Sequence, residues 1–213
     1  MAVIPLAAAC AGLVSACLWS IAGNWFFPSA LPQNFHLIHW RDMTSYIPLL
    51  KNSFLLAGGA SFAALFAVLT WSYAVPFSNF TNRWLLGCIF MPFFIPQISF
   101  LLGMQISLSR VGLDGTWFAL VWVHMIFILP YTWLIVIPAR RALDHRLDHL
   151  AATLGASGWK RFITLHMPLM AYPLATALFI GIAVSMALYL PTVFVGAGRI
   201  NTITVEAVSL ASS

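Results

Sequence analysis

Charge is what this sequence has least of. Asp, Glu, Lys and Arg together make up 7% of its 213 residues, whereas hydrophobic residues make up 62%. An ordinary globular domain carries roughly 25% charged residues, so this composition excludes a water-soluble surface. The few charges are also grouped, and five long stretches contain none of them: 1–40, 52–82, 84–109, 115–139 and 162–198.

Each stretch exceeds the ~20 residues that an α-helix needs to cross a hydrocarbon core about 30 Å thick. Backbone groups without hydrogen-bond partners in lipid cost several kcal/mol each, so stretches of this kind should be helical. A transmembrane barrel would instead show alternating segments of about ten residues, and runs such as 85–90 do not alternate. The sequence therefore predicts an all-α integral membrane protein, with residues 1–213 forming one domain.

An ATP site is also absent. A phosphate-cradling loop needs Gly-Lys-Ser or Gly-Lys-Thr, but the only two lysines, Lys51 and Lys160, follow Leu50 and Trp159. The three cysteines all lie in predicted membrane segments, which is typical of packing residues rather than of a disulfide framework. We therefore expect no catalytic residue, no metal, no cofactor and no ATPase activity in this chain.

What the sequence does contain is a series of five predicted spans. Pro92 and Pro96 should kink or break the third of them, because proline removes a backbone donor. In the second, Gly59, Ala63 and Ala67 recur every fourth residue, a spacing typical of close helix contacts. The tail 191–213 does not resemble a spanning helix. The predicted spans lie at about 4–25, 52–75, 84–108, 117–139 and 168–190.

Basic residues indicate the orientation. The segment 140–167, between the fourth and fifth spans, holds Arg140, Arg141, Arg146, Lys160 and Arg161, half of all Lys and Arg. Cytoplasmic loops are enriched in these residues, so this loop and, by parity, the N-terminus are predicted to be cytoplasmic. The same bias accounts for the net charge of +5, so we predict membrane lipid as the surrounding and no nucleic-acid partner.

Leucines stand out within this loop. Leu143, Leu147, Leu150 and Leu154 are spaced by four, three and four residues, which places them on one face of a short helix that Gly155 would end. A cytosolic helix with an apolar face is suited to docking into a groove on a partner. It is equally suited to lying flat at the membrane interface, and the residues alone leave both interpretations open.

The loop resembles the cytoplasmic EAA loop of permease subunits from binding-protein-dependent ABC importers. That pattern reads Glu-Ala-Ala, three residues, Gly, nine residues, an aliphatic residue, any residue, Leu and Pro. Aligned on Gly155, Pro168 takes the position of the Pro. Ala151 matches the second Ala, and Leu165 and Met167 stand at the aliphatic and Leu positions. Leu150 replaces the first Ala, and His149 stands where the pattern has Glu.

The resemblance implies a type I importer bundle in the bacterial inner membrane, forming half of a translocation pathway for a small solute. Its partners would be a separate ATPase subunit, coupled through 143–162, a second permease half, identical or different, and a periplasmic or lipid-anchored solute-binding protein. The implied coupling residues are Asp148, which would partly replace the missing Glu, His149, Ala151, Gly155, Trp159 and Pro168.

Two finer expectations come from the same resemblance. Family members usually carry a sixth helix after the fifth, so we expect that this chain is truncated or is one part of a longer permease. The segment 190–208 is similar to permeases grouped with thiamine, iron and sulfate systems, and a thiamine-like solute is the first expectation.

Polar residues inside predicted spans are candidates for the pathway, because burying them in lipid is costly. His124 in the fourth span and Gln97 and Gln105 in the third are the candidates here. The structural alternative for His124 is a neutral side chain that hydrogen-bonds a neighbouring helix, and the glutamines could also join helices.

Two other functions fit parts of the sequence. His145, Asp148 and His149 follow the H-x-x-acid-H order of a zinc site, which would indicate an intramembrane metalloenzyme. The acid is Asp where that motif has Glu, however, and no third ligand is evident. An ion-coupled secondary transporter commonly buries carboxylates, whereas all five acidic residues here lie outside the predicted spans.

Overall fold

The computed structural model describes residues 3–23, 34–35, 37–41, 43–75 and 83–212. Over these residues it is helical and contains no strand, only an isolated bridge between Ala22 and Phe35. Residues 76–82, between the second and third predicted spans, and most of the residues between the first and second lie outside the described residues. Two compact units are present, residues 1–48 and 49–213, and each is described by itself.

The first unit contains α1 (Val3–Ile21), α2 (Ile38–Arg41) and the 3₁₀ turn η1 (Met43–Tyr46). The chain returns to the end of α1, because the Trp40 indole Nε1 donates hydrogen bonds to Ser20 Oγ at 3.0 Å and to the Ser20 carbonyl at 3.2 Å. The predicted first span thus falls on α1, and Pro5–Ile21 within it is one of the shorter apolar helices.

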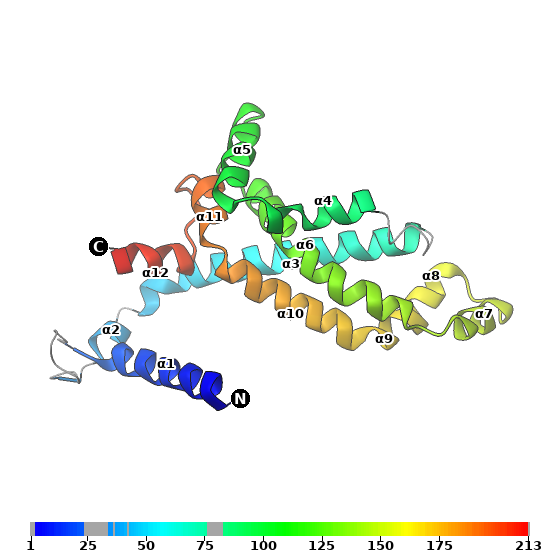
Figure 1. Cartoon of the computed structure of the whole chain (residues 1–213), viewed down its shortest axis with the longest axis horizontal. Helices are drawn as coiled ribbons and strands as arrows, with labels where there is room; N and C mark the ends of the chain where they lie inside the picture. Colours follow the sequence, from blue (N-terminus) through cyan, green and yellow to red (C-terminus); the bar gives the residue numbers. More distant parts are fainter. Residues whose placement is uncertain (1–2, 24–33, 36, 42, 76–82, 213) are drawn as a thin grey trace. The chain divides into compact units, whose positions relative to one another are not determined.

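The second unit is built around long helices. The helix α6 packs against α10, and the short elements that follow α6 lie at one end of the pair while α11 and α12 lie at the other (Figure 1). The helices are α3 (Ile47–Ala74), α4 (Arg83–Phe94), α5 (Gln97–Arg110), α6 (Trp117–Arg141), α7 (His145–Thr153), α8 (Gly158–Arg161), the π-helical turn η3 (Phe162–His166), α9 (Met167–Leu169), α10 (Ala171–Ala187), α11 (Tyr189–Gly196) and α12 (Ile203–Ser212).

Within the described residues there are two candidate spans, or up to four if each bent helix pair counts as one, and the first of the five predicted spans falls on an apolar helix shorter than these. Met43–Ala74 and Trp117–Arg141 are each long and apolar enough to cross a membrane. The third predicted span is broken into α4 and α5, which meet at 109°, and a 73° bend after Leu169 lies at the start of the fifth. Pro96 stands at the α4–α5 break, where its missing N–H ends the helix, whereas Pro92 is accommodated inside α4.

Small residues bring α3, α6 and α10 together. In α3, Ala57, Ala60 and Ala64 are fully buried, so the small-residue face differs from the predicted one, whose first member, Gly59, is exposed. Lipid tails are as apolar as leucine, so these contacts depend on van der Waals packing rather than on hydrophobic burial. The tightest contact involves Gly181 of α10, where an added Cβ would lie 2.8 Å from Ser61 Oγ.

Candidate functional site

The loop that carries the importer-like pattern folds as a short capped helix. The Asp144 carboxylate accepts a hydrogen bond from the backbone N–H of Arg146 at 2.8 Å and so caps the start of α7. Gly155 ends the helix in the left-handed conformation, with φ of +77°. The Gly155 N–H donates to the Ala152 carbonyl and the Ala156 N–H to the Ala151 carbonyl, both at 3.0 Å, which is the hydrogen-bond pattern of a Schellman cap.

The leucines of the loop do not all behave alike. Leu143 precedes α7 and packs against the core cluster that contains Val136 and Met170. Leu147, Leu150 and Leu154 keep the predicted spacing and are 42%, 59% and 87% exposed. The four-leucine face predicted from the sequence is therefore a three-leucine face, and the chain leaves it uncovered.

The return segment leads from the loop back to the long helices. Ser157 Oγ caps α8 by accepting a hydrogen bond from the Lys160 N–H at 3.3 Å. Trp159 is 71% exposed and stacks on Phe162, with ring centroids 5.5 Å apart. The π-helical turn η3 follows and joins α9, which contains Pro168, before α10 begins at Ala171. The two pieces, α7 and α8, form a helix–turn–helix, in which α7 is the short helix that the sequence predicts before Gly155.

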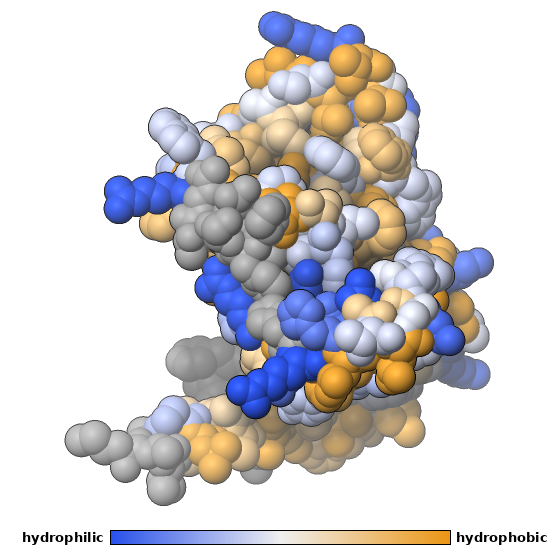
Figure 2. Space-filling model, turned by 90° about the vertical axis from the view of Figure 1, so that its right-hand side faces the viewer, coloured by the Kyte–Doolittle hydropathy of each residue, from blue (hydrophilic) through white to orange (hydrophobic). Residues whose placement is uncertain are grey.

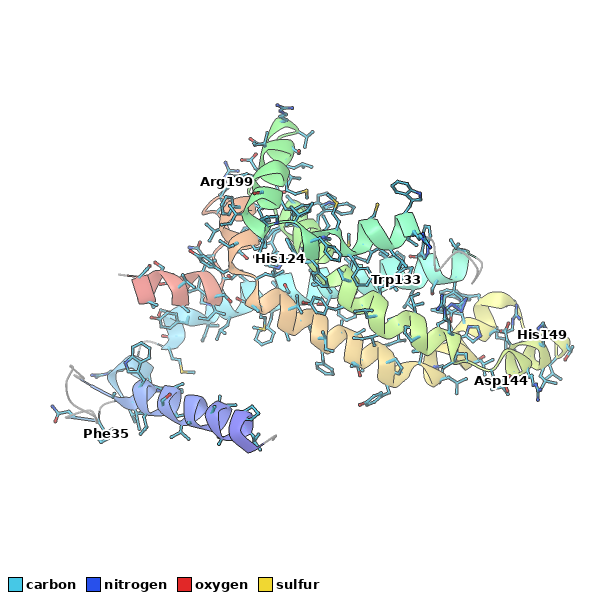
Figure 3. The ribbon with its side chains drawn as sticks, in the orientation of Figure 1. Phe35, His124, Trp133, Asp144, His149 and Arg199 are labelled. Carbon is cyan, nitrogen blue, oxygen red and sulfur yellow. The ribbon has the colours of Figure 1, made fainter. Side chains whose placement is uncertain are left out.

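Both carboxylate oxygens of Asp148 have partners within the loop. Its Oδ2 lies 3.0 Å from Arg161 Nη1, and its Oδ1 lies 3.1 Å from His166 Nε2. Burial lowers the pKa of His166, opposed by the Asp148 charge, so the neutral imidazole donates its Nε2 hydrogen to Asp148 near pH 7. Its neighbour His149 is exposed. The two adjacent candidates therefore differ: Asp148 pairs with Arg161 and His166 within the loop, whereas His149 is exposed at the end of the second unit that carries the loop (Figure 3).

Residues of the long helices continue the contacts of Asp148 and His166. The Tyr73 ring from α3 stacks on His166 with centroids 5.4 Å apart, and meets Phe162 edge-on at 5.0 Å. The guanidinium carbon of Arg140 from α6 lies 3.6 Å from the Tyr73 ring centroid, a cation–π contact. Arg140 Nε also donates to the Ser72 carbonyl at 3.0 Å.

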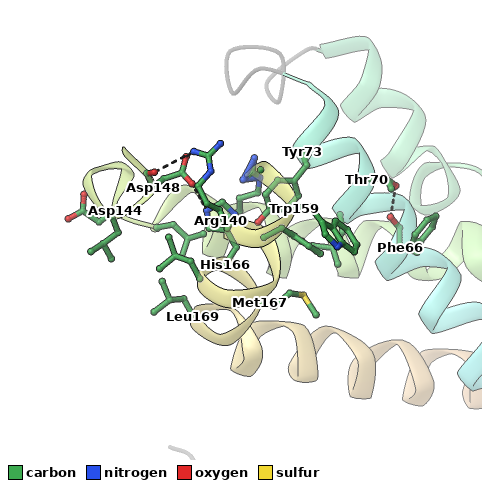
Figure 4. A pocket seen from close by; sticks show the side chains of 17 residues that line it. Phe66, Thr70, Tyr73, Arg140, Asp144, Asp148, Trp159, His166, Met167 and Leu169 are labelled. Carbon is green, nitrogen blue, oxygen red and sulfur yellow. Dashed lines mark hydrogen bonds and ion pairs between the residues drawn. The ribbon is translucent and has the colours of Figure 1, made fainter. Parts of the chain in front are cut away.

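These groups line a cavity of about 720 Å³ between the end of α3 and the loop, shown in Figure 4. Its wall is mixed: Phe66, Leu69 and Met167 are apolar, whereas Tyr73 and Arg140 bring polar groups. Sequence reasoning missed Arg161 and His166 as the partners of Asp148, and Tyr73 and Arg140 as the residues that continue these contacts to the long helices. The proximity of one acid to two bases 13 and 18 residues later could have indicated the two pairs within the loop.

His124 of α6 is fully buried and bridges α10 and α11. Its Nδ1 lies 2.8 Å from Ser185 Oγ, and its Nε2 lies 3.2 Å from Thr192 Oγ1. This arrangement agrees with the structural alternative for His124, in which its ring nitrogens form hydrogen bonds with neighbouring helices. Gln97 and Gln105 lie on α5 and are partly exposed, so they keep their place as pathway candidates.

The residues behind the two alternative functions are also placed. His145 and His149 lie one turn apart on α7, but Asp148, the acid of that motif, is paired with Arg161 and His166. Among the residues that the structure describes, no three His, Cys, Asp or Glu form a group that could hold a metal ion. The four described acids, Asp114, Asp144, Asp148 and Glu206, lie outside the two unbroken candidate spans.

Comparison with known proteins supports the pattern in the loop. The family model described as "Binding-protein-dependent transport system inner membrane component" matches residues 65–210. The inner membrane ABC transporter permease protein YnjC of Escherichia coli K12 is 37% identical over 163 residues, which are 76% of this chain and 31% of that protein. PhnV proteins of Salmonella paratyphi A and Salmonella typhimurium, named as permeases of a 2-aminoethylphosphonate transport system, are 27% identical over 130 residues.

Those 130 residues are 58% of this chain and 49% of the PhnV proteins. The chain thus spans about a third to a half of the length of the relatives it matches. The matched region nevertheless runs from the middle of α3 into α12 and contains the whole α7–α8 loop. This chain, a multi-pass protein of the inner membrane, belongs to the family of binding-protein-dependent transport system inner membrane components.

Proposed function

We propose that the chain is a permease subunit of an ABC importer, and that a separate ATPase drives it through the α7–α8 loop. The observation that carries the proposal is the exposed three-leucine face of Leu147, Leu150 and Leu154. Asp148 of the same helix pairs with Arg161 and so fixes the helix to the return segment. An amphipathic helix of this kind lays its apolar face into a groove on a partner.

The surroundings of this face suit a protein partner. Figure 2 looks onto the end of the second unit that carries the loop, and hydrophobic and hydrophilic side chains lie next to each other there. Arg146 and Lys160 are exposed beside the leucines and Trp159. An apolar centre bordered by charged residues is the usual composition of a docking surface.

The remaining parts of the proposal follow from this docking. The loop and the N-terminus face the cytosol, and Gln97, Gln105 and His124 lie along or beside a pathway completed by a second permease half. The loop residues Asp148, His149, Ala151, Gly155, Trp159 and Pro168 form or support the coupling surface. An external binding protein delivers the solute, for which the candidates are a thiamine-like compound and, from the names of the PhnV relatives, a phosphonate.

Leu150→Asn tests the docking face. Burying a leucine is worth about 1.5–3 kcal/mol, so losing this contact should weaken co-purification of the ATPase subunit by roughly tenfold or more. Ala152→Asn is the matched control, because Ala152 is exposed on the same helix but is not part of the leucine face. Quantitative pull-down of the ATPase with the full chain gives the measurement, and equal recovery with both variants would refute docking through this face.

A further inference from the structure

The helix α7 has no apolar anchor of its own. None of its residues whose exposure is described is buried, and its leucines point away from the rest of the chain or line the cavity. A helix that is pushed by a partner can move other helices only if it is firmly attached to them. Leu143, just before α7, packs against the core, but within α7 itself the attachment comes from the polar contacts of Asp148.

The two carboxylate oxygens of Asp148 are divided between two elements. Oδ2 pairs with Arg161 at the end of α8, and Oδ1 pairs with His166 at the end of η3. Arg161 Nη1 also lies 3.4 Å from the Asp148 carbonyl oxygen. Hydrogen bonds to a charged group are shorter and about twice as strong as neutral ones, so a single side chain fixes α7 to the return segment.

The contacts continue from there to the long helices. His166 stacks on Tyr73 of α3. The guanidinium of Arg140 from α6 lies over the same Tyr73 ring. The Arg140 side chain then returns to the Ser72 carbonyl of α3. A continuous series of contacts thus joins the coupling helix to the ends of both unbroken candidate spans, as Figure 4 shows around Asp148, His166, Tyr73 and Arg140.

We infer that Asp148 is a positioning residue for energy coupling: it transmits movement of α7 to the ends of α3 and α6 through Arg161, His166 and Tyr73. The inference rests on the proposed function, because it presumes that an ATPase moves α7. It assigns Asp148 a role inside the permease, whereas the alternative is a direct contact between its carboxylate and the ATPase.

The test uses the full chain assembled with its ATPase in vesicles. Cys10, Cys17 and Cys88 are replaced by serine, and Gln105→Cys on α5 reports the state of the pathway through its labelling rate with a membrane-impermeant maleimide. Addition of ATP and vanadate should change this rate by about fivefold or more, the lower end of typical coupling between sites. If the labelling rate does not change in the protein with the unmodified loop, although the ATPase traps nucleotide, the proposed function is refuted.

Asp148→Asn should reduce the response to within about twofold while the ATPase still co-purifies and traps nucleotide. Asp144→Asn is the matched control, since Asn caps a helix as well as Asp does, and should leave the response unchanged. Because Asp148 and Arg161 act through each other, Arg161→Gln combined with Asp148→Asn should be no worse than the poorer single variant. The inference would be overturned if Asp148→Asn kept the full change in labelling rate, or if it lost the ATPase. It would also be overturned if the effects of the two substitutions added up in the double variant.

Discussion

Gly155→Pro should abolish recovery of the ATPase subunit with this chain. Proline fixes φ near −65°, whereas Gly155 has φ of +77°. The substitution also removes the N–H that donates to the Ala152 carbonyl, and it disfavours the ψ of 7° at Leu154, because a residue before proline prefers extended backbone. Together these effects should cost about 3 kcal/mol or more, enough to unfold the end of α7 and to misdirect its leucines.

Gly158→Pro is the matched control, three residues along the same loop. Gly158 is the first residue of α8, a position where proline is favoured, and Ser157 before it already has ψ of 159°. Gly155→Asn should also retain most of the ATPase, because Asn tolerates the left-handed conformation. Equal recovery of the ATPase with Gly155→Pro and Gly158→Pro would show that the cap does not position the docking face.

Gly181→Leu should be the most damaging change among the long helices. A Cβ at this position would lie 2.8 Å from Ser61 Oγ and 3.0 Å from Ile128 Cγ2, so α10 must move away from α3 and α6. Overpacking of this kind costs about 1–3 kcal/mol, which corresponds to a loss of roughly 2–12 °C in Tm for a chain of this size. Leucine makes the helix more apolar, so a lower Tm in detergent reports packing rather than poor membrane insertion.

Gly87→Leu on α4 provides the comparison, because an added Cβ there has nothing within 4 Å. It should leave Tm unchanged. Ser61→Gly should recover part of the Tm lost in Gly181→Ala, since it removes the nearest atoms. If the Tm of Gly181→Leu equals that of the wild type, α10 does not approach α3 as closely as described.

Local features of the sequence predicted much of the helical framework. Stretches without charge marked α3 and α6 because lipid leaves no other partner for the backbone, and Pro96 marked the break between α4 and α5. Gly155 marked the end of α7, since only glycine adopts its conformation without strain. These predictions depend on residues within a few positions of each other, where chain geometry alone decides.

Features that depend on tertiary contacts could not be read in the same way. The face of α3 that packs was assigned to Gly59, Ala63 and Ala67. The fully buried alanines are instead Ala57, Ala60 and Ala64, because the partner helix sets which face is covered. The contact of His166 with Tyr73 joins residues from separate helices. The partners of His124, which are 61 and 68 residues away, likewise follow from the packing of α6 against α10 and α11.

The coupling role proposed for the α7–α8 loop requires that the loop face the cytosol, and thiol labelling tests this directly. Leu154→Cys, at a position that is 87% exposed, is introduced into the chain with Cys10, Cys17 and Cys88 replaced by serine. A membrane-impermeant maleimide should label it in inside-out vesicles, should not label it in right-side-out vesicles, and should label it more slowly when the ATPase subunit is present. Labelling from the outer face, or from neither face, would contradict the assignment of this loop as the coupling element.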